Sequence, residues 1–196
     1  MTITNGYATS AQFFAFAIPN AGTSTGDDVV IEQIIESASR VIDNETRRTF
    51  YARGETRYYD TPPGNTLELD DDLISVAKLT NGDGTEITAG DYLTKPYNES
   101  PKYAVKIKDT SNVVFEFDST NNGEKAISLS GSWGWSSSVP KDIEVATLEI
   151  AKNVYHRRAG EGESSETTVT AAGVIITPND IPKSARAVIQ KYQRFA

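Results

Sequence analysis

The chain has 196 residues, a length that fits a single core carrying an insertion. Its net charge of −8 argues against general binding to DNA or to anionic membranes, because their phosphates would repel it. The sequence contains no cysteine, which excludes disulfide scaffolds, thiolate metal sites and cysteine nucleophiles. The early apolar stretch Phe13–Ile18 is too short for a signal sequence or a membrane span, so we expect a soluble protein without membrane contact.

Two helices are expected before the first strand. Thr9 can cap a short helix over Ser10–Phe16, which Pro19 and the polar run after it would stop. The clearest helix of the sequence follows over Asp27–Arg48, because its apolar residues recur at helical spacing. These residues are Ile31, Ile34, Ile35, Ala38, Val41 and Ile42. The pattern predicts one apolar face that packs against other elements.

From Tyr51 to Trp135 the apolar period changes from about 3.6 to about 2, which is typical of strands. Turn sequences such as Asn81–Gly84 and Asn121–Gly123 separate the short runs, since Gly and Asn accept positive φ. We therefore expect antiparallel hairpins here. The candidate strands are Thr56–Tyr59, Thr66–Leu69, Leu73–Leu79, Thr85–Ile87, Asp91–Thr94, Tyr103–Lys108, Val113–Phe117 and Ala126–Ser130.

Helical spacing returns after Pro140, and this helix is expected to end with His156, Arg157 and Arg158. Residues 159–178 form an acidic segment rich in Gly, Ser and Thr, with too little apolar surface to order itself in a monomer. A last amphipathic helix is expected over Pro182–Arg194, capped by Asp180.

This order of elements predicts an α+β fold. Because none of the three long helices can bury its apolar stripe alone, we expect them to form a small α-helical bundle together with the short N-terminal helix. Residues 1–50 and 137–196 would build this helical domain. Residues 51–136 would form an antiparallel β module inserted into it, and residues 159–178 an acidic loop.

The search for catalytic or metal sites favours structural interpretations. Asp70–Asp72 is interpreted as a solvated turn at the entry of a strand, since neighbouring strand residues point to opposite faces. The Asn81–Gly84 run begins like a calcium loop, but Glu86 and Tyr92 stand where that loop requires Gly and Glu. We therefore expect no metal and no cofactor. A less favoured alternative is a hydrolase or sugar-binding β module that uses Asp70, Asp72 or Asp83 near Trp133 and Trp135.

Two further features have competing interpretations. His156, the single histidine, is interpreted as a surface residue that complements the helix dipole. The aromatic residues of Trp133–Trp135, with Tyr58 and Tyr59, could form a platform for sugar or single-stranded nucleic acid. Since no basic groove accompanies them, a hydrophobic seam between the β module and the following helix is favoured.

The C-terminal helix shows the clearest charge asymmetry. Its basic residues have no acidic neighbour after the cap, whereas the preceding segment is wholly acidic. This segregation indicates contact with an acidic surface or complementary contacts between subunits, or else an ordinary solvated face. The basic candidates are Lys183, Arg186, Lys191 and Arg194. The candidates for contacts with another subunit or with a neck protein in the acidic segment are Glu161, Glu163, Glu166, Val174, Ile175 and Ile176.

Several motifs resemble the head–tail adaptor (connector) proteins of tailed bacteriophages. They occur in the same order and cover nearly the whole chain. The matching segments are Ile3–Thr9, Ile34–Asp43, Thr46–Tyr51, Thr56–Asp60, Gly131–Ile143 and Tyr155–Arg158.

The resemblance implies a non-enzymatic homo-oligomeric ring, with the twelvefold symmetry of the portal protein, that lies beneath the portal and extends the DNA channel. The helices would form the ring wall, and the C-terminal helix with Lys183, Arg186, Lys191 and Arg194 would bind the portal. Outer loops would receive the next neck or tail protein, a stopper or tail-completion protein, and such a ring protein is itself an alternative assignment. Double-stranded DNA would pass without sequence-specific binding. The protein would be found in the virion, and in the host cytoplasm during assembly.

Overall fold

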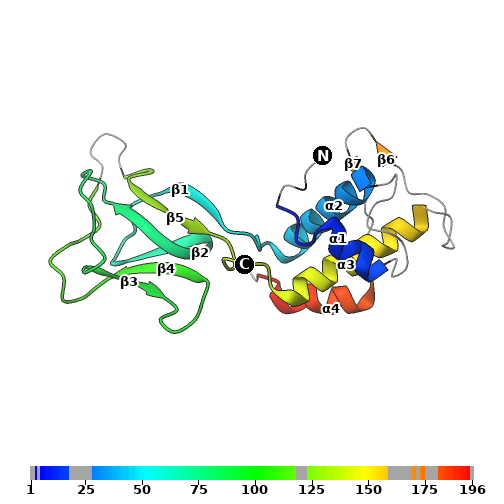
Figure 1. The fold of residues 1–196 in the computed structure, drawn as a ribbon. Coiled ribbons are helices and arrows are strands. Elements are labelled where there is room, and N and C mark those ends of the chain that lie inside the picture. The colour runs from blue at the N-terminus through cyan, green and yellow to red at the C-terminus, as the bar shows by residue number, and fades with distance from the viewer. Residues whose placement is uncertain are drawn as a thin grey trace. The chain divides into compact units, whose positions relative to one another are not determined.

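The computed structural model describes residues 3, 5–17, 28–117, 123–158, 169–170, 173–174 and 181–194. The chain divides into two compact units. The first comprises Met1–Arg48 and Val139–Ala196 and contains the helices, and the second comprises Thr49–Ser138 and contains a five-stranded sheet (Figure 1). The sheet, which has its own core, is therefore a structural unit in its own right.

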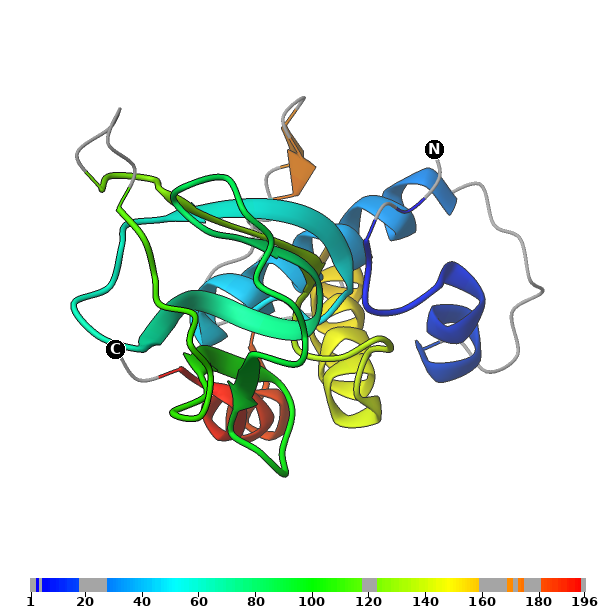
Figure 2. The same cartoon turned by 90° about the vertical axis from the view of Figure 1, so that its left-hand side faces the viewer.

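The described part of the helical unit contains four helices (Figure 2). They are α1 (Ser10–Ala17), α2 (Asp28–Thr46), α3 (Lys141–Arg158) and α4 (Lys183–Tyr192). Helices α2 and α3 each contact the other three helices, so these two form the centre of this unit.

The N-terminal segment packs against α2. Tyr7 is buried, and its hydroxyl donates a hydrogen bond to Asp43 while its backbone N–H donates to Ser39 Oγ at 3.0 Å. The guanidinium of Arg40 lies 5.6 Å from the centre of the Tyr7 ring and donates to the carbonyl of Asn5 at 2.9 Å. Residues of the N-terminal motif thus serve to attach this segment to α2.

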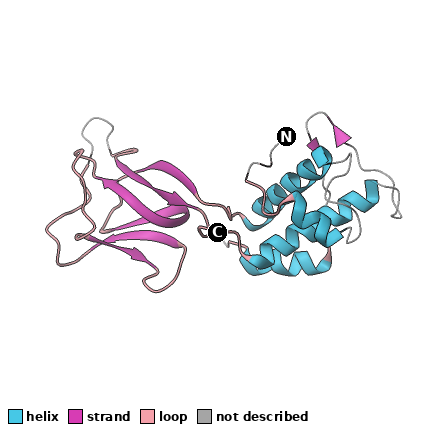
Figure 3. Cartoon of the chain, in the orientation of Figure 1, coloured by secondary structure: helices cyan, strands magenta, loops and turns pink. Residues whose placement is uncertain are grey.

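Five strands, drawn in magenta in Figure 3, form one antiparallel sheet. Their order in the sheet is β1–β5–β2–β4–β3. The strands are β1 (Arg53–Tyr59), β2 (Thr66–Thr80), β3 (Tyr92–Lys95), β4 (Lys102–Ile107) and β5 (Ile127–Trp133). A two-stranded pair, β6 (Val169–Thr170) and β7 (Gly173–Val174), belongs to the first unit, where β7 contacts α2.

The long strand β2 changes partner along its length. Its first part pairs with β4, and its second part, from Leu73 on, pairs with β5. The register shifts between Glu68 and Leu73, so the strand carries an irregularity there. Asp70–Asp72 lies in this irregular stretch, within β2, and Asp72 is 2% exposed. The interpretation of these residues as a solvated turn at a strand entry is therefore wrong.

The expected fold class, a bundle of three long helices with an inserted β module, is also wrong. In the described part of the chain only α2 and α3 are long, with 19 and 18 residues, whereas α4 has 10. The sheet is the dominant element of this α+β structure and has its own core. That core consists of Leu67, Leu69, Leu73, Leu79, Ile87, Val105, Ile107, Ile127, Leu129 and Trp133.

Two expected strands are absent from the described residues. Thr85–Ile87 makes only an isolated bridge, between Thr80 and Glu86. Val113–Phe117 is irregular because the Asn81 side chain bonds its backbone: Nδ2 donates to the carbonyl of Val114 and Oδ1 accepts from the N–H of Glu116, both at 2.8 Å. The Thr61 hydroxyl also donates to the carbonyl of Glu116, so side chains take the place of a neighbouring strand for part of this backbone.

None of the helices in the described ranges is sufficiently long and apolar to cross a membrane.

Candidate functional site

Helix α4 is attached to the helical unit by an apolar side and by a carboxylate of α3. Ala185 and Ile189 are buried, whereas the Tyr192 hydroxyl and the Lys191 ammonium both bind Asp142 at 2.9 Å. Burial acts to raise the pKa of Asp142, but the hydrogen bonds from Lys191 and Tyr192 lower the pKa below its ordinary value. A charged Asp142 therefore holds the C-terminal end of α4 against the start of α3.

The opposite side of α4 is exposed. Lys183, Arg186, Ala187 and Gln190 are spaced three, four and seven residues from the first, so they share one helix face, and all four are exposed. This exposed α4 face carries two of the four basic residues considered as portal contacts.

The other two basic candidates have intramolecular roles. Lys191 is paired with Asp142, as described above. Arg194 follows α4 and is half-buried, and its backbone N–H donates to the carbonyl of Thr46 at 2.9 Å. Arg48 Nε donates to the carbonyl of Tyr192 at 2.7 Å. The end of α4 is thus tied to the end of α2, which the sequence pattern did not predict.

Most of the proposed contacts in the acidic segment lie outside the described residues. This holds for Glu161, Glu163, Glu166, Ile175 and Ile176. Val174 belongs to β7, which pairs with β6 and contacts α2. The assignment of these residues to subunit contacts stays a prediction. Asp180 is also outside the described residues, and Pro182 occupies the N-cap position of α4 without a side-chain hydrogen bond.

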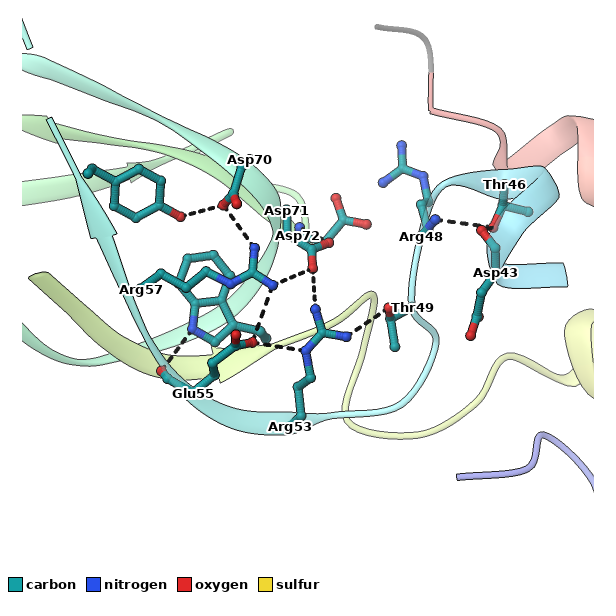
Figure 4. A network of polar contacts seen from close by, with 12 residues as sticks. Asp43, Thr46, Arg48, Thr49, Arg53, Glu55, Arg57, Asp70, Asp71 and Asp72 are labelled. Carbon is teal, nitrogen blue, oxygen red and sulfur yellow. Dashed lines mark hydrogen bonds and ion pairs between the residues drawn. The ribbon is translucent and has the colours of Figure 1, made fainter. Parts of the chain in front are cut away.

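A charged cluster on the sheet unit joins β1 to the irregular stretch of β2 (Figure 4). The guanidinium of Arg57 lies 4.4 Å from the centre of the Trp133 ring and donates to Asp70 at 2.8 Å and to Asp71 at 2.9 Å. A second arginine also donates to Asp71, and both arginines donate to a glutamate of β1. We call Arg53, Glu55, Arg57, Asp70 and Asp71 the arginine cluster.

The electrostatics of the arginine cluster stabilise its ionised form. Burial alone would raise the pKa of Asp70, but hydrogen bonds from Tyr59 and Arg57 lower it. Burial alone would lower the pKa of Arg57, and the bond and charge of Asp70 raise it instead. Burial raises the pKa of Tyr59, which donates to Asp70 at 2.6 Å. A carboxylate with a lowered pKa is unsuited to act as a general acid near neutral pH.

The carboxylates considered for a hydrolase are not arranged as such a site requires. Asp70 is bound by Arg57, and Asp72 is buried. Asp83 lies in the turn after β2 and accepts hydrogen bonds from Thr85. Asp72 and Asp83 lie beyond opposite ends of the stretch from Leu73 to Thr80. This stretch pairs with five residue steps of β5, about 17 Å at about 3.3 Å per residue, whereas paired glycosidase carboxylates are about 5–10 Å apart.

The aromatic residues considered as a platform are largely occupied by contacts within the sheet unit. Trp133 is fully buried in the sheet core, and its Nε1 donates to the carbonyl of Glu55 at 3.0 Å. Trp135 packs on Phe50, with ring centres 6.2 Å apart. Tyr58 is 62% exposed. A stacking surface needs several accessible rings, and Trp133 cannot contribute to one.

The arginine cluster was missed in the sequence, although a signal was present. Arg53, Glu55 and Arg57 alternate along one segment, so in a strand they share a face. The interpretation of Asp70–Asp72 as a solvated turn did not predict that Asp70 and Asp71 bind these arginines. The described residues contain no group of three or more His, Cys, Asp or Glu side chains arranged to hold a metal ion.

Comparisons with known proteins place this fold in context. No family model matches the sequence, and no curated protein is significantly similar to it. The structure is similar to a chain in the solved neck of an empty GTA (gene transfer agent) particle, computed with C6 symmetry. The TM-score is 0.63 and the sequence identity 14%, and the match covers 100% of this chain and 94% of that chain. The two chains share one fold.

Proposed function

We propose that this chain is a structural protein in the neck of a tailed phage or phage-like particle. The observation that carries the proposal is the similarity to the GTA neck chain, which extends over essentially the full length of both proteins. A fold by itself does not determine function. Here the structural similarity agrees with an independent observation, the ordered series of adaptor-like motifs in the sequence.

Within the neck, we assign the chain the role of the head–tail adaptor. In this role it forms a homo-oligomeric ring, twelvefold like the portal, beneath the portal protein, and it extends the DNA channel. Its outer surface receives the stopper or tail-completion protein. The exposed α4 face, with Lys183 and Arg186, is assigned to the portal contact, since basic side chains on an accessible helix face suit an acidic partner surface.

The charge of the chain supports a passive role toward DNA. With a net charge of −8, a ring of such chains repels phosphates, so DNA slides past without adhering. The carboxylates Asp70 and Asp71 are engaged by arginines, which supports a structural role for these groups. We therefore propose that the protein acts in the virion by binding its neighbours and without catalysis.

The test is to measure the mass of the purified protein alone and after mixing with purified portal rings. The adaptor role requires a particle whose added mass equals one 21.3 kDa chain per portal subunit. A protein that binds only to a portal already carrying another neck ring is a stopper or tail-completion protein instead. A chain that binds neither contradicts the neck assignment.

A further inference from the structure

The sheet unit carries a surface on which exposed apolar and acidic side chains lie together. Hydrogen bonds join the segments that form it. The N–H of Thr61 donates to the carbonyl of Gly123 at 3.0 Å, and its hydroxyl donates to the carbonyl of Glu116 at 3.2 Å. The side chain of Asn81 binds the backbone on either side of residue 115. We call this surface the acidic patch, and its segments are residues 60–61, 81–85, 113–117 and 123–125.

Two large apolar side chains of the acidic patch are held in solvent. Val114 is 59% exposed and Phe117 is 60% exposed. Val113 and Phe115 pack against the sheet core, and the bonds from Asn81 fix the backbone in this orientation. Exposed apolar side chains with a polar rim are typical of contacts between proteins. Because the backbone here is already ordered, binding a partner costs little conformational entropy.

The polar rim of the acidic patch is negatively charged. Its carboxylates face a single basic residue within these segments, Lys125. The hydrogen bonds that Asp60 and Asp83 accept come from uncharged groups, the backbone N–H of Lys125 and the N–H and hydroxyl of Thr85. The patch therefore attracts a cationic surface and repels an anionic one. The exposed carboxylates are Asp60, Asp83, Glu116 and Glu124.

This charge distinguishes the partner of the patch from the portal. The exposed α4 face, which is assigned to the portal, is basic and suits an acidic surface, whereas the acidic patch repels such a surface. Repulsion also disfavours a second copy of this chain, whose net charge is −8. An adaptor has one further neighbour, the stopper or tail-completion protein, which we call the tail-side neck protein.

We propose that the acidic patch binds the tail-side neck protein, through a surface on which lysine or arginine side chains surround an apolar contact. This inference rests on the proposed function and specifies the surface of this chain that its second neighbour uses. Val114 and Phe117 supply the apolar centre, and the carboxylates supply the rim, which is the usual arrangement of a protein interface.

The experiment measures how tightly the purified tail-side neck protein of the same particle binds to the full-length chain assembled on portal rings, at low and at high salt. Binding to wild type should weaken as salt rises, because salt screens the attraction. The triple variant Asp83→Asn, Glu116→Gln, Glu124→Gln should bind about tenfold more weakly, with a smaller salt dependence. Phe117→Ser should also bind about tenfold more weakly but keep the salt dependence of wild type, because no charge changes.

A matched control neutralises three exposed carboxylates outside the patch, in the triple variant Glu45→Gln, Glu68→Gln, Glu99→Gln. Its net charge equals that of the patch variant, so a general effect of charge would alter both. We expect the control to bind as wild type does, since salt screens charges that lie far from the contact. Melting temperatures equal to wild type show that the variants are folded.

The outcomes separate this inference from the proposed function. If the chain assembles on portal rings but the patch variant and the control bind the tail-side neck protein equally, the patch is not the contact, although the neck role stands. The same holds if wild type on portal rings does not bind that protein. Loss of portal binding or a changed ring mass in the patch variant means that the portal or a second copy occupies the patch, which also overturns the inference. A wild-type chain that binds neither protein contradicts the proposed function itself.

Discussion

At the scale of single residues, Arg57 connects the most groups on the polar side of the sheet. Its side chain is 15% exposed, stacks on Trp133 and bonds Asp70, Asp71 and Glu55. The two terminal nitrogens of this guanidinium bind the carboxylates, whereas its buried Nε has no hydrogen-bond partner. Removal of the side chain leaves those carboxylates without their partner. The cluster therefore holds β1 and β2 together across β5, which lies between them in the sheet.

We predict that Arg57→Met destabilises the protein by about 2 kcal/mol, because the carboxylates lose their charge-assisted hydrogen bonds. Urea-induced unfolding monitored by tryptophan fluorescence would measure this, since Trp133 lies beneath the guanidinium. The control Lys78→Met changes an exposed side chain and should alter the free energy of unfolding by no more than about 0.5 kcal/mol. Equal effects of the two variants would show that the cluster contributes little.

The arginine cluster also predicts that the stability of the protein depends on pH. The folded-state pKa values of Asp70 and Glu55 lie below their ordinary values of 3.8 and 4.5, because bonds to the arginines, and for Asp70 also to Tyr59, outweigh the effect of burial. A depressed pKa contributes stability above the ordinary pKa, which is lost as pH falls through the folded-state value. Melting temperatures should therefore fall below about pH 5, and fall less steeply in Arg57→Met. Parallel curves for both proteins would refute this origin.

At the scale of elements, β5 lies between β1 and β2, and at Gly131 the backbone of β5 lies close to the backbone of β2. A Cβ atom at Gly131 would lie 2.3 Å from the Ser75 carbonyl oxygen and 3.0 Å from Leu73 Cδ1. Gly54, on β1, has no neighbouring atom within 4 Å of such a Cβ. The two glycines therefore differ in space although both lie in strands.

We predict that Gly131→Ala destabilises the protein by about 1–3 kcal/mol through overpacking against the Ser75 backbone. Gly54→Ala should change the free energy of unfolding by about 0.5 kcal/mol or less. Chemical denaturation of both variants gives the comparison. A Gly131→Ala protein as stable as Gly54→Ala would mean that β2 moves aside without cost.

The proposed portal contact assigns different roles to two sides of α4. Reversing Lys183 and Arg186 to Glu should leave the stability within about 0.5 kcal/mol of wild type, yet weaken portal binding and its salt dependence, since attraction becomes repulsion. Lys191→Glu should instead lower the melting temperature, because it repels Asp142. Differential scanning fluorimetry and portal co-sedimentation measure the two properties. Wild-type portal binding by the Lys183 and Arg186 double variant would remove α4 from the interface.

Helices could be predicted where apolar residues recur at helical spacing. The strand prediction was wrong where side chains, and not a neighbouring strand, bind the backbone. The helix expected over Asp27–Arg48 is α2, since its buried isoleucines lie on one stripe. Val113–Phe117 has the composition of a strand, but its backbone is bonded by Asn81, which no local pattern shows. The last helix is expected to end at Arg194, whereas α4 ends at Tyr192 because the backbone of Gln193 is not helical.

For the candidate site, the sequence shows which residues are charged, but it does not show which residues they bind. The basic character of α4 is visible in the sequence, but Lys191 meets an acid 49 residues away, at Asp142. Arg57 likewise meets Asp70 only because β2 and β1 both flank β5. Contacts between distant segments depend on strand order and helix packing, which a single sequence does not specify.

At the scale of the whole molecule, the match to the GTA neck chain covers 100% of this chain and therefore includes both compact units. The shared fold is therefore not confined to one small module. The net charge of −8 adds that a ring of these chains would not retain DNA. The central claim is that the protein occupies the neck of an assembled particle.

The most direct test is to purify tailed particles from the phage or phage-like element whose genes encode this protein. Quantitative mass spectrometry then gives the copy number of this chain relative to the portal protein. We predict one copy per portal subunit, and particles lacking the chain should have DNA-filled heads without attached tails. Purified, infectious particles that contain no copies of the chain would contradict the account.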